Sequence, residues 1–277
     1  VMGPTGAGKS TFIANLLDNN NKKPNISHGL QSCTQAVSHF VMQVPQALLK
    51  KYPQLHSRRI VLVDTPGFDD TDVSDYEILR RVAAWVASSQ IKVGAVLYIY
   101  PITSNRITNN DRTNLEIFNK LCGTETMSKV MLATSKWNND PYEKEICESR
   151  EKELTEKFWL PLKQQGAKHG RLVNSVKSAN SLLDKMVEQL VKVENTQGPR
   201  ENEFGTALAV QIQLIDKGRN LPQTAAAQEL RKKLDALLKE QKASGNTESV
   251  KQKAQELIRQ LEDLKLSFGD RLKMLFA

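Results

Sequence analysis

The sequence predicts an α/β fold in which a doubly wound, mostly parallel sheet is followed by C-terminal helices. Two observations predict the sheet: short apolar runs alternate with helical patterns, and a glycine-rich stretch stands directly before the first helix. A third predicts the appended helices, because beyond residue 200 Lys, Glu, Gln, Leu and Ala dominate and no strand signal remains. The 277 residues suffice for one large domain, or for a medium domain with an appendage.

The glycine-rich stretch that opens the chain fits the phosphate-binding loop pattern G-x-x-x-x-G-K-S. Glycines let the backbone aim its N–H groups at phosphates, and the dipole of the following helix adds to the attraction. We expect Lys9 to reach the β- and γ-phosphate oxygens as a catalytic residue, and the Ser10 hydroxyl to bind Mg²⁺. The alternative is a glycine-rich turn without a ligand, which leaves the Lys-Ser ending unexplained. The predicted nucleotide-binding residues here are Gly3, Pro4, Thr5, Gly6, Ala7, Gly8, Lys9, Ser10 and Thr11.

A second motif, Asp64-Thr65-Pro66-Gly67, follows the apolar run 60–63. We expect Asp64, at the carboxyl end of that strand, to hold the same metal ion. Gly67 is expected to offer its N–H to the γ-phosphate, which would make the following segment a nucleotide sensor and Gly67 a catalytic residue. The alternative is an ordinary Asp-x-Pro-Gly turn. The two motifs in this order predict a P-loop nucleoside triphosphatase fold.

A third site residue is expected between the first helix and the first strand. In GTPases a threonine in this region contacts Mg²⁺ and the γ-phosphate only before hydrolysis. Thr34, with Ser32 behind it, is the candidate in the segment 27–34 and is assigned to both catalysis and the metal. The alternative is a plain loop threonine.

The elements expected along the chain follow its apolar periodicity. Helices are expected where apolar residues recur every three or four positions, and strands where short apolar runs occur. Pro101, Gly123 and Gly166 are expected to end the elements that precede them. The predicted helices are 9–17, 75–89, 112–121, 142–165 and 182–191, and the predicted strands are 40–44, 60–63, 93–100, 130–133 and 172–173.

A turn-rich break at 195–200 predicts a domain boundary. We expect a G domain over 1–193, lacking the N-terminal end of its first strand, a linker over 194–222 and a helical extension over 223–277. In the extension, leucines share one helical face up to a breaker at 243–246, and a second helix follows with Thr247 as its candidate N-cap. An antiparallel hairpin and a coiled-coil segment both fit, and the hairpin can pack on its own domain or bind a partner.

Composition adds weaker expectations. The apolar content is 39%, and no apolar run approaches membrane-spanning length. Cys33, Cys122 and Cys147 lack metal or redox spacing, so free thiols and a cytoplasmic location, including the cytosolic face of a membrane, are expected. The formal charge of +8 is spread over helices without aromatic interleaving, which favours a solvated surface over contact with acidic lipid or nucleic acid.

Together these motifs resemble the septin-like branch of GTPases, especially the GIMAP (AIG-type) proteins and the chloroplast import receptors. The residues that carry the resemblance are Gly3 to Thr11 with Asn15, Ser32-Cys33-Thr34 and Asp64 to Phe68. Uncharacterised fungal G-domain proteins of this branch are similar at further positions, at 29–34, 64–71, 121–123, 150–151 and 158–159. The resemblance implies a doubly wound G domain, GTP or GDP with Mg²⁺, and nucleotide-dependent association into homodimers or oligomers through the G domain and the helical tail.

Two departures from the usual GTPase pattern concern hydrolysis and the base. Phe68 stands where Ras-like enzymes have a water-orienting glutamine, so hydrolysis by the isolated protein should be slow. The base is expected to meet Lys136 and Asn138, and an asparagine in place of aspartate should lower guanine discrimination by about 1–3 kcal/mol, unless Asp140 takes that place. Ser178-Ala179 matches the dipeptide whose backbone faces the base.

Three function classes follow from these residues. The first is a slow, Mg²⁺-dependent GTPase that works as a switch or assembly module. The second is a nucleotide-gated scaffold that binds GTP with negligible hydrolysis. The third, a phosphotransferase or ATPase, is disfavoured by the Asp64-Thr65-Pro66-Gly67 motif and by the absence of an ATPase signature between the two motifs.

Overall fold

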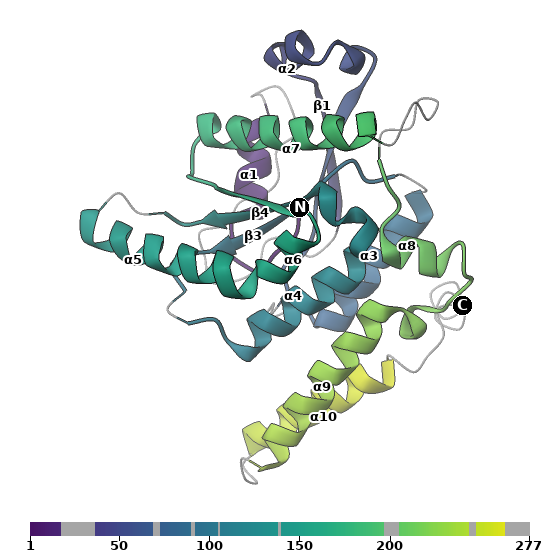
Figure 1. Cartoon of the computed structure of the whole chain (residues 1–277). Helices are drawn as coiled ribbons and strands as arrows, with labels where there is room; N and C mark the ends of the chain where they lie inside the picture. The colour runs from purple at the N-terminus through teal and green to yellow at the C-terminus, as the bar shows by residue number, and fades with distance from the viewer. Residues whose placement is uncertain are drawn as a thin grey trace. The chain divides into compact units, whose positions relative to one another are not determined.

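The computed structural model describes residues 1–17, 37–68, 73–89, 92–104, 106–137, 140–196, 205–243 and 248–263. Helices and strands alternate along most of the chain, as predicted (Figure 1). The chain forms two compact units, the first comprising Val1–Asp72, Lys92–Asn105 and Met127–Thr206, the second Val73–Ile91, Arg106–Thr126 and Ala207–Ala277.

The first unit contains the sheet. Strands β3, β4 and β5 are parallel neighbours in that order, whereas β1 and β2 form an antiparallel pair. Met2 connects the start of the chain to β3, because its N–H donates to Leu97 O at 2.7 Å and its carbonyl accepts from Ile99 N at 2.9 Å. The elements of this unit are α1 Lys9–Leu16, β1 Ser38–Gln43, α2 Gln46–Lys51, β2 Arg59–Asp64, β3 Val96–Pro101, β4 Val130–Ser135, α5 Pro141–Glu153, α6 Leu160–Gln164, β5 Lys168–Arg171 and α7 Val176–Thr196.

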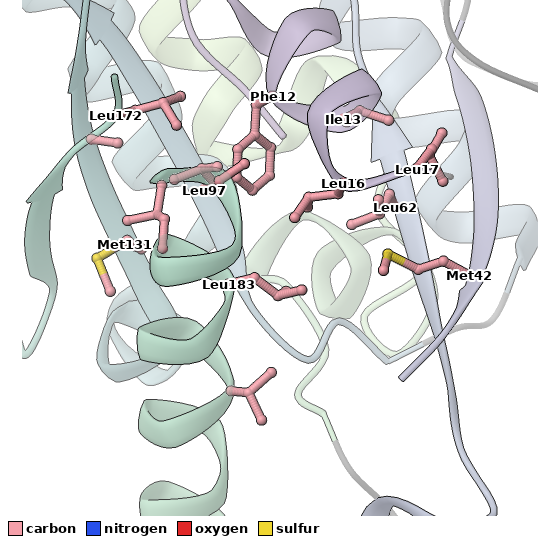
Figure 2. Packing of buried hydrophobic residues seen from close by; sticks show 14 of the residues in the cluster. Phe12, Ile13, Leu16, Leu17, Met42, Leu62, Leu97, Met131, Leu172 and Leu183 are labelled. Atoms are coloured by element: carbon pink, nitrogen blue, oxygen red, sulfur yellow. The ribbon is translucent and has the colours of Figure 1, made fainter. Parts of the chain in front are cut away.

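Helices α1 and α7 build the core of the first unit against the strands. The spacing of Phe12 and Leu16 places both on one face of α1, and Figure 2 shows them directed toward Leu97 of β3 and Leu183 of α7. Met131 of β4 belongs to the same buried cluster. The glycine-rich loop that precedes α1 is therefore attached to a helix with a firmly buried face.

The long helix predicted over 142–165 is wrong in its middle. The helix α5 passes into a π-helical turn, Leu154–Phe158, and a separate short helix, α6, follows. Pro161 stands in the first turn of α6, where its missing N–H costs no hydrogen bond, whereas in the middle of one long helix it would remove a donor and crowd the preceding turn. Trp159, at the junction, is buried.

Two strand predictions also need correction. The last strand is Lys168–Arg171 rather than 172–173, because an edge strand with Lys, His and Arg side chains gives almost no apolar signal. The strand predicted as buried over 60–63 is only partly so: Val61 is 43% exposed and lies opposite Val41, which is 41% exposed. These two strands belong to the antiparallel pair, in which one face can remain solvated.

The second unit is helical. It contains α3 Asp75–Ser89, α4 Asn109–Cys122, α8 Ala209–Leu214, α9 Ala225–Ala243 and α10 Glu248–Asp263. Helix α9 packs against α3 and α4, and the buried Lys233 on α9 donates to Asp75 Oδ2 at 2.6 Å and to Asn114 Oδ1 at 2.9 Å. An ammonium so enclosed is stable only while both partners stay in place, since removing one partner of a buried ion pair costs about 3–5 kcal/mol.

The C-terminal helices form the predicted hairpin, with α9 and α10 side by side (Figure 1). Through α9, this hairpin packs on helices of its own chain. The stretch 194–222, expected to be a linker, contains α8 and the first two residues of the 3₁₀ turn Leu221–Gln223. The candidate N-cap Thr247 lies outside the described residues. The division of the chain at 193 and 222 remains a prediction.

We predict that Gly123→Ala destabilises the protein more than Gly218→Ala does. Both glycines have positive φ, at 81° and 56°, but only at Gly123 would a Cβ lie 2.5 Å from the Ala209 Cβ. Urea unfolding should show a loss of about 3 kcal/mol for Gly123→Ala and about 1 kcal/mol for the matched Gly218→Ala. Equal losses would mean that the contact with Ala209 adds nothing.

Candidate functional site

The glycine-rich loop is pressed against the carboxyl end of β3. A Cβ on Gly3, where φ is 138°, would lie 2.1 Å from Ile99 O, so no other residue fits at this position. The loop then turns into α1, whose first residue is Lys9. All nine predicted loop residues, Gly3, Pro4, Thr5, Gly6, Ala7, Gly8, Lys9, Ser10 and Thr11, thus lie at the N-terminus of one helix, beside the edge of the sheet where parallel strands end.

Lys9 folds back over the loop to which it belongs. Its side chain is buried, and Nζ donates to Gly3 O at 3.2 Å and to Pro4 O at 2.9 Å. The ammonium is therefore held over the concave backbone by carbonyl groups. From there it can reach an anion that binds to the N–H groups of the same turn.

Ser10 and Asp64 meet as predicted. Ser10 Oγ donates to Asp64 Oδ2 at 2.6 Å, although the two residues are 54 positions apart in the sequence. Asp64 is only 1% exposed, and its second oxygen, Oδ1, has no hydrogen-bond partner among the residues that the structure describes. A buried carboxylate oxygen without a donor is costly unless a cation accompanies it. The hydroxyl and the carboxylate are hard oxygen ligands, so the pair fits Mg²⁺.

The segment after Asp64 lies directly on the loop. Thr5 N donates to Phe68 O at 3.1 Å, and a Cβ on Gly67 would lie 2.5 Å from Thr5 N. Gly67 is thus brought to the loop, as its predicted role requires. Phe68 is 1% exposed, so its ring is packed inside the protein and does not face the loop's solvent side.

Ser135, at the end of β4, braces the loop from the other side. Its Oγ donates to Ala7 O at 2.7 Å across 128 positions of sequence. The next residue, Lys136, is exposed and has a φ of 62°. Asn138, predicted to read the base, lies outside the described residues, as do Thr34 and Ser32. Lys136 therefore stands one residue from a direct contact with the phosphate-binding loop.

Asp140 already has a structural role, which weakens the suggestion that it replaces the missing base-reading aspartate. It is the N-cap of α5, and its Oδ1 accepts from Tyr142 N at 3.0 Å and from Glu143 N at 3.2 Å. Moving this carboxylate to a base would uncap the helix, at a cost of about 1 kcal/mol.

Ser178 and Ala179 lie in the first turn of α7 with their backbone donors in use. Ser178 N donates to Ser175 Oγ at 3.1 Å, and Ala179 N donates to Ser175 O at 3.0 Å. Ala179 is also part of the buried core. In this conformation the dipeptide does not present free N–H groups, so its predicted contact with a base would require the helix start to rearrange.

Sequence reasoning missed a polar cluster beside Lys136. Trp137 Nε1 donates to Thr134 O at 3.1 Å and to Thr134 Oγ1 at 3.2 Å. The Arg171 guanidinium carbon lies 4.2 Å from the centroid of the Trp137 ring, and Glu151 binds that guanidinium at 2.6 Å. These residues come from three separate elements with no shared motif, so only the fold brings them together.

Further surveys of the described residues give three results. No helix there is both long enough and apolar enough to cross a membrane. No cluster of three or more His, Cys, Asp or Glu residues that could hold a metal ion is found among them. Cys122 and Cys147 are buried free thiols, as expected, and Cys33 lies outside the described part.

Comparison with known proteins supports a particular family. Residues 1–156 match the model of the AIG1 family. A structure of the chloroplast translocon components atToc33 and psToc159 is 12% identical over 74% of this chain and 84% of that one, with a TM-score of 0.53. Toc33 from Arabidopsis thaliana with GDP and Mg²⁺ is 14% identical over 69% and 83%, with a TM-score of 0.50. At such identities the two structures show a shared fold, and no curated protein is significantly similar in sequence.

The family match covers more than half of the chain and includes the glycine-rich loop, Asp64 and Gly67. The expected doubly wound fold is confirmed by the parallel strands and by these neighbours, whereas the closer likeness to fungal proteins remains a prediction. The chain belongs to the AIG1 family, with a P-loop GTPase domain of the AIG1 type.

Proposed function

We propose that this protein binds GTP and GDP with Mg²⁺ and hydrolyses GTP slowly, as a nucleotide-dependent switch or assembly module. The observation that carries the proposal is the contact of Ser10 with the buried Asp64 beneath the glycine-rich loop, where one carboxylate oxygen has no protein partner among the described residues. Family membership supports the same reading. Among the structural neighbours, Toc33 from Arabidopsis thaliana was solved with GDP and Mg²⁺.

The binding roles follow from the positions described above. The N–H groups of the loop hold the α- and β-phosphates, and Lys9 neutralises the β- and γ-phosphate oxygens. Ser10 and Asp64 hold Mg²⁺, directly or through water, with Thr34 as a further predicted ligand. When bound, the metal ion offsets phosphate charge. Gly67 donates its N–H to the γ-phosphate, so the segment after Asp64 senses whether that phosphate is present.

Slow hydrolysis follows from Phe68. The position that holds a water-orienting amide in Ras-like enzymes carries a buried phenyl ring, and the carbonyl of Phe68 is engaged by Thr5 N–H. A ring inside the core can neither orient water nor donate to a developing charge. Catalysis beyond a basal rate therefore requires a polar group from elsewhere.

A second chain of the same protein is the proposed source of that group. The neighbouring structure of atToc33 and psToc159 was described with the statement that dimerization is important for their GTPase activity. An arginine supplied in trans is worth roughly 10³-fold or more. The exposed Arg106 is one candidate donor, and His28, outside the described residues, is another. We place this assembly in the cytoplasm, with the helical tail as a further self-association element.

The base is proposed to lie beyond the carboxyl end of β4, near Lys136 and Asn138. Guanine selectivity is then weaker than in aspartate-bearing GTPases, by about 1–3 kcal/mol, because an asparagine offers one acceptor oxygen and an amide donor. Ser178 and Ala179 join the site only if the start of α7 rearranges, since their N–H groups now bond to Ser175.

The alternative function is a scaffold that binds GTP with negligible hydrolysis. The buried ring of Phe68 favours it, because the described part of the site offers no replacement for the missing amide. Both functions share the nucleotide site and differ only in turnover.

We predict that Lys9→Ala weakens GTP binding by roughly 100-fold, because two charge-assisted hydrogen bonds to phosphate are lost. Isothermal titration calorimetry with GTP and Mg²⁺ measures the change, and circular dichroism checks that the fold is kept. Lys50→Ala, which removes an exposed lysine on α2, is the matched control and should bind like the wild type. Binding within a few-fold of the wild type by a folded Lys9→Ala protein would refute the phosphate-loop assignment.

Ser10→Ala should remove most of the Mg²⁺ dependence of GTP binding. In the wild type, adding Mg²⁺ should tighten GTP by at least about tenfold, or ~1.4 kcal/mol, because the hydroxyl and Asp64 share the metal ion. Titrations with Mg²⁺ and with a chelator give the ratio for each protein. The exposed Ser57 supplies the control Ser57→Ala, which should keep the full ratio. An unchanged ratio in Ser10→Ala would place the metal elsewhere.

Turnover per molecule should be slow at nanomolar protein and should rise toward tens of micromolar, since the completing group comes from a second chain. Phosphate release, together with sizing in GDP and in a non-hydrolysable GTP analogue, tests this. A flat specific activity in a protein that stays monomeric with the analogue would exclude self-activation. The scaffold function would then be favoured if turnover is also negligible.

A further inference from the structure

Lys136 has the backbone strain of a residue that its surroundings hold in place. It is the one non-glycine residue with positive φ, 62°, in the part of the chain that the structure describes. A left-handed conformation is unfavourable for a residue with a Cβ, and it persists where neighbouring contacts determine it. The contacts on both sides of Lys136 therefore decide where its side chain is directed.

The contact on the N-terminal side is with the phosphate-binding loop. Ser135 Oγ donates to Ala7 O at 2.7 Å and to Tyr100 O at 3.4 Å, both buried contacts. This fixes the last residue of β4 before the chain turns. A change in the backbone of Lys136 must therefore be absorbed on its C-terminal side.

The contact on the C-terminal side is a closed set of interactions, here called the indole lock, made by Thr134, Trp137, Glu151 and Arg171. Trp137 Nε1 donates to the carbonyl and hydroxyl oxygens of Thr134 at 3.1 and 3.2 Å. The Thr134 hydroxyl donates to Glu151 Oε1 at 2.9 Å, and Arg171 Nε donates to Glu151 Oε2 at 2.7 Å.

The stack of Arg171 on the indole, 4.2 Å from guanidinium carbon to ring centroid, closes the set. Thr134 is fully buried and the Glu151 side chain is 13% exposed, so the hydrogen bond between them is largely shielded from water, whereas the Arg171 side chain is 44% exposed. A second carboxylate, Glu148, also binds Arg171, at 3.2 Å. The guanidinium is thereby oriented by two acidic side chains and can present a planar face to the ring.

The lock lies where a ligand of this fold would meet the protein. Thr134 is near the carboxyl end of β4, and Arg171 is at the carboxyl end of the parallel neighbour β5. In open α/β sheets ligands bind outside these ends. Trp137 directly follows Lys136, which is proposed to meet the base, so contacts that hold the indole also restrain the backbone on the C-terminal side of Lys136.

We propose that the indole lock holds Lys136 in position for the base of the nucleotide, with Trp137 and Arg171 as positioning residues that govern affinity for the base and leave the phosphates to the glycine-rich loop. This inference rests on the proposed function, because it requires that GTP is the ligand. A residue held in place before binding loses little conformational freedom on binding, and that saving is confined to the part of the ligand which the residue touches.

The test compares GTP, inosine triphosphate and inorganic tripolyphosphate, each with Mg²⁺, on the full chain. Trp137→Phe keeps a ring but removes the donor to Thr134, and Arg171→Gln removes the stack. Each should weaken GTP and inosine triphosphate by roughly tenfold and leave tripolyphosphate within about twofold. Matched controls are Trp85→Phe on α3 and Arg59→Gln, an exposed arginine on β2, which should leave all three ligands unchanged.

The double variant adds a criterion that a general loss of stability would not meet. If both residues act through one lock, the double variant should bind GTP only slightly less tightly than the single variant with the lower GTP affinity. The reason is that the effects of coupled residues are not additive. Equal weakening of GTP and tripolyphosphate, or unchanged GTP affinity in folded single variants, would overturn the lock. A wild type that binds tripolyphosphate but not GTP would overturn both the lock and the proposed function. Equal GTP affinities of the wild type and the variants would overturn the lock alone.

Discussion

The rest of the site depends on how the glycine-rich loop is seated among the strand ends. Gly3 leaves no room for a side chain beside Ile99, and the Ala7 carbonyl is held by Ser135 at the end of β4. On its other side the loop donates a hydrogen bond from Thr5 N to Phe68 O. Three segments far apart in the sequence thus determine one curved backbone, and this rigidity lets its N–H groups converge on an anion without being ordered by it.

The same seating separates binding from catalysis. Lys9 is buried over the loop carbonyls and Ser10 is bonded to the buried Asp64, so the charge and the oxygen ligands that the proposed triphosphate and metal ion need are present within the first unit. The Phe68 carbonyl accepts a hydrogen bond from Thr5 N of the loop, whereas its buried ring occupies the position at which Ras-like GTPases orient water. One residue thus contacts the loop through its backbone and lacks the amide that would orient water, which is why slow intrinsic turnover is proposed.

Several polar groups near the site already have structural roles, and this limits what they can do chemically. Asp140 caps α5, and the N–H groups of Ser178 and Ala179 bond to Ser175. In the second unit, Lys233 ties α9 to α3 and α4, so the C-terminal helices share a buried polar centre with helices from the middle of the chain. A donor or acceptor that already has a buried partner is recruited to a ligand only at the cost of that contact.

The sequence by itself determined the glycine-rich loop before α1 and most of the helices and strands, because loop glycines, a Lys-Ser pair and apolar periodicity act locally. The order of the two motifs also predicted that Ser10 and Asp64 share one site, and the structure brings the two side chains together. Apolar periodicity missed the polar edge strand β5, which carries almost no apolar side chains, and it missed the interruption at Pro161, although proline is itself a local signal against one long helix. Tertiary structure alone decided that Trp137 and Arg171 stack and that α9 packs on α3 and α4. The physical reason is range: a motif records contacts within one turn of chain, whereas these contacts join segments whose separation only folding removes.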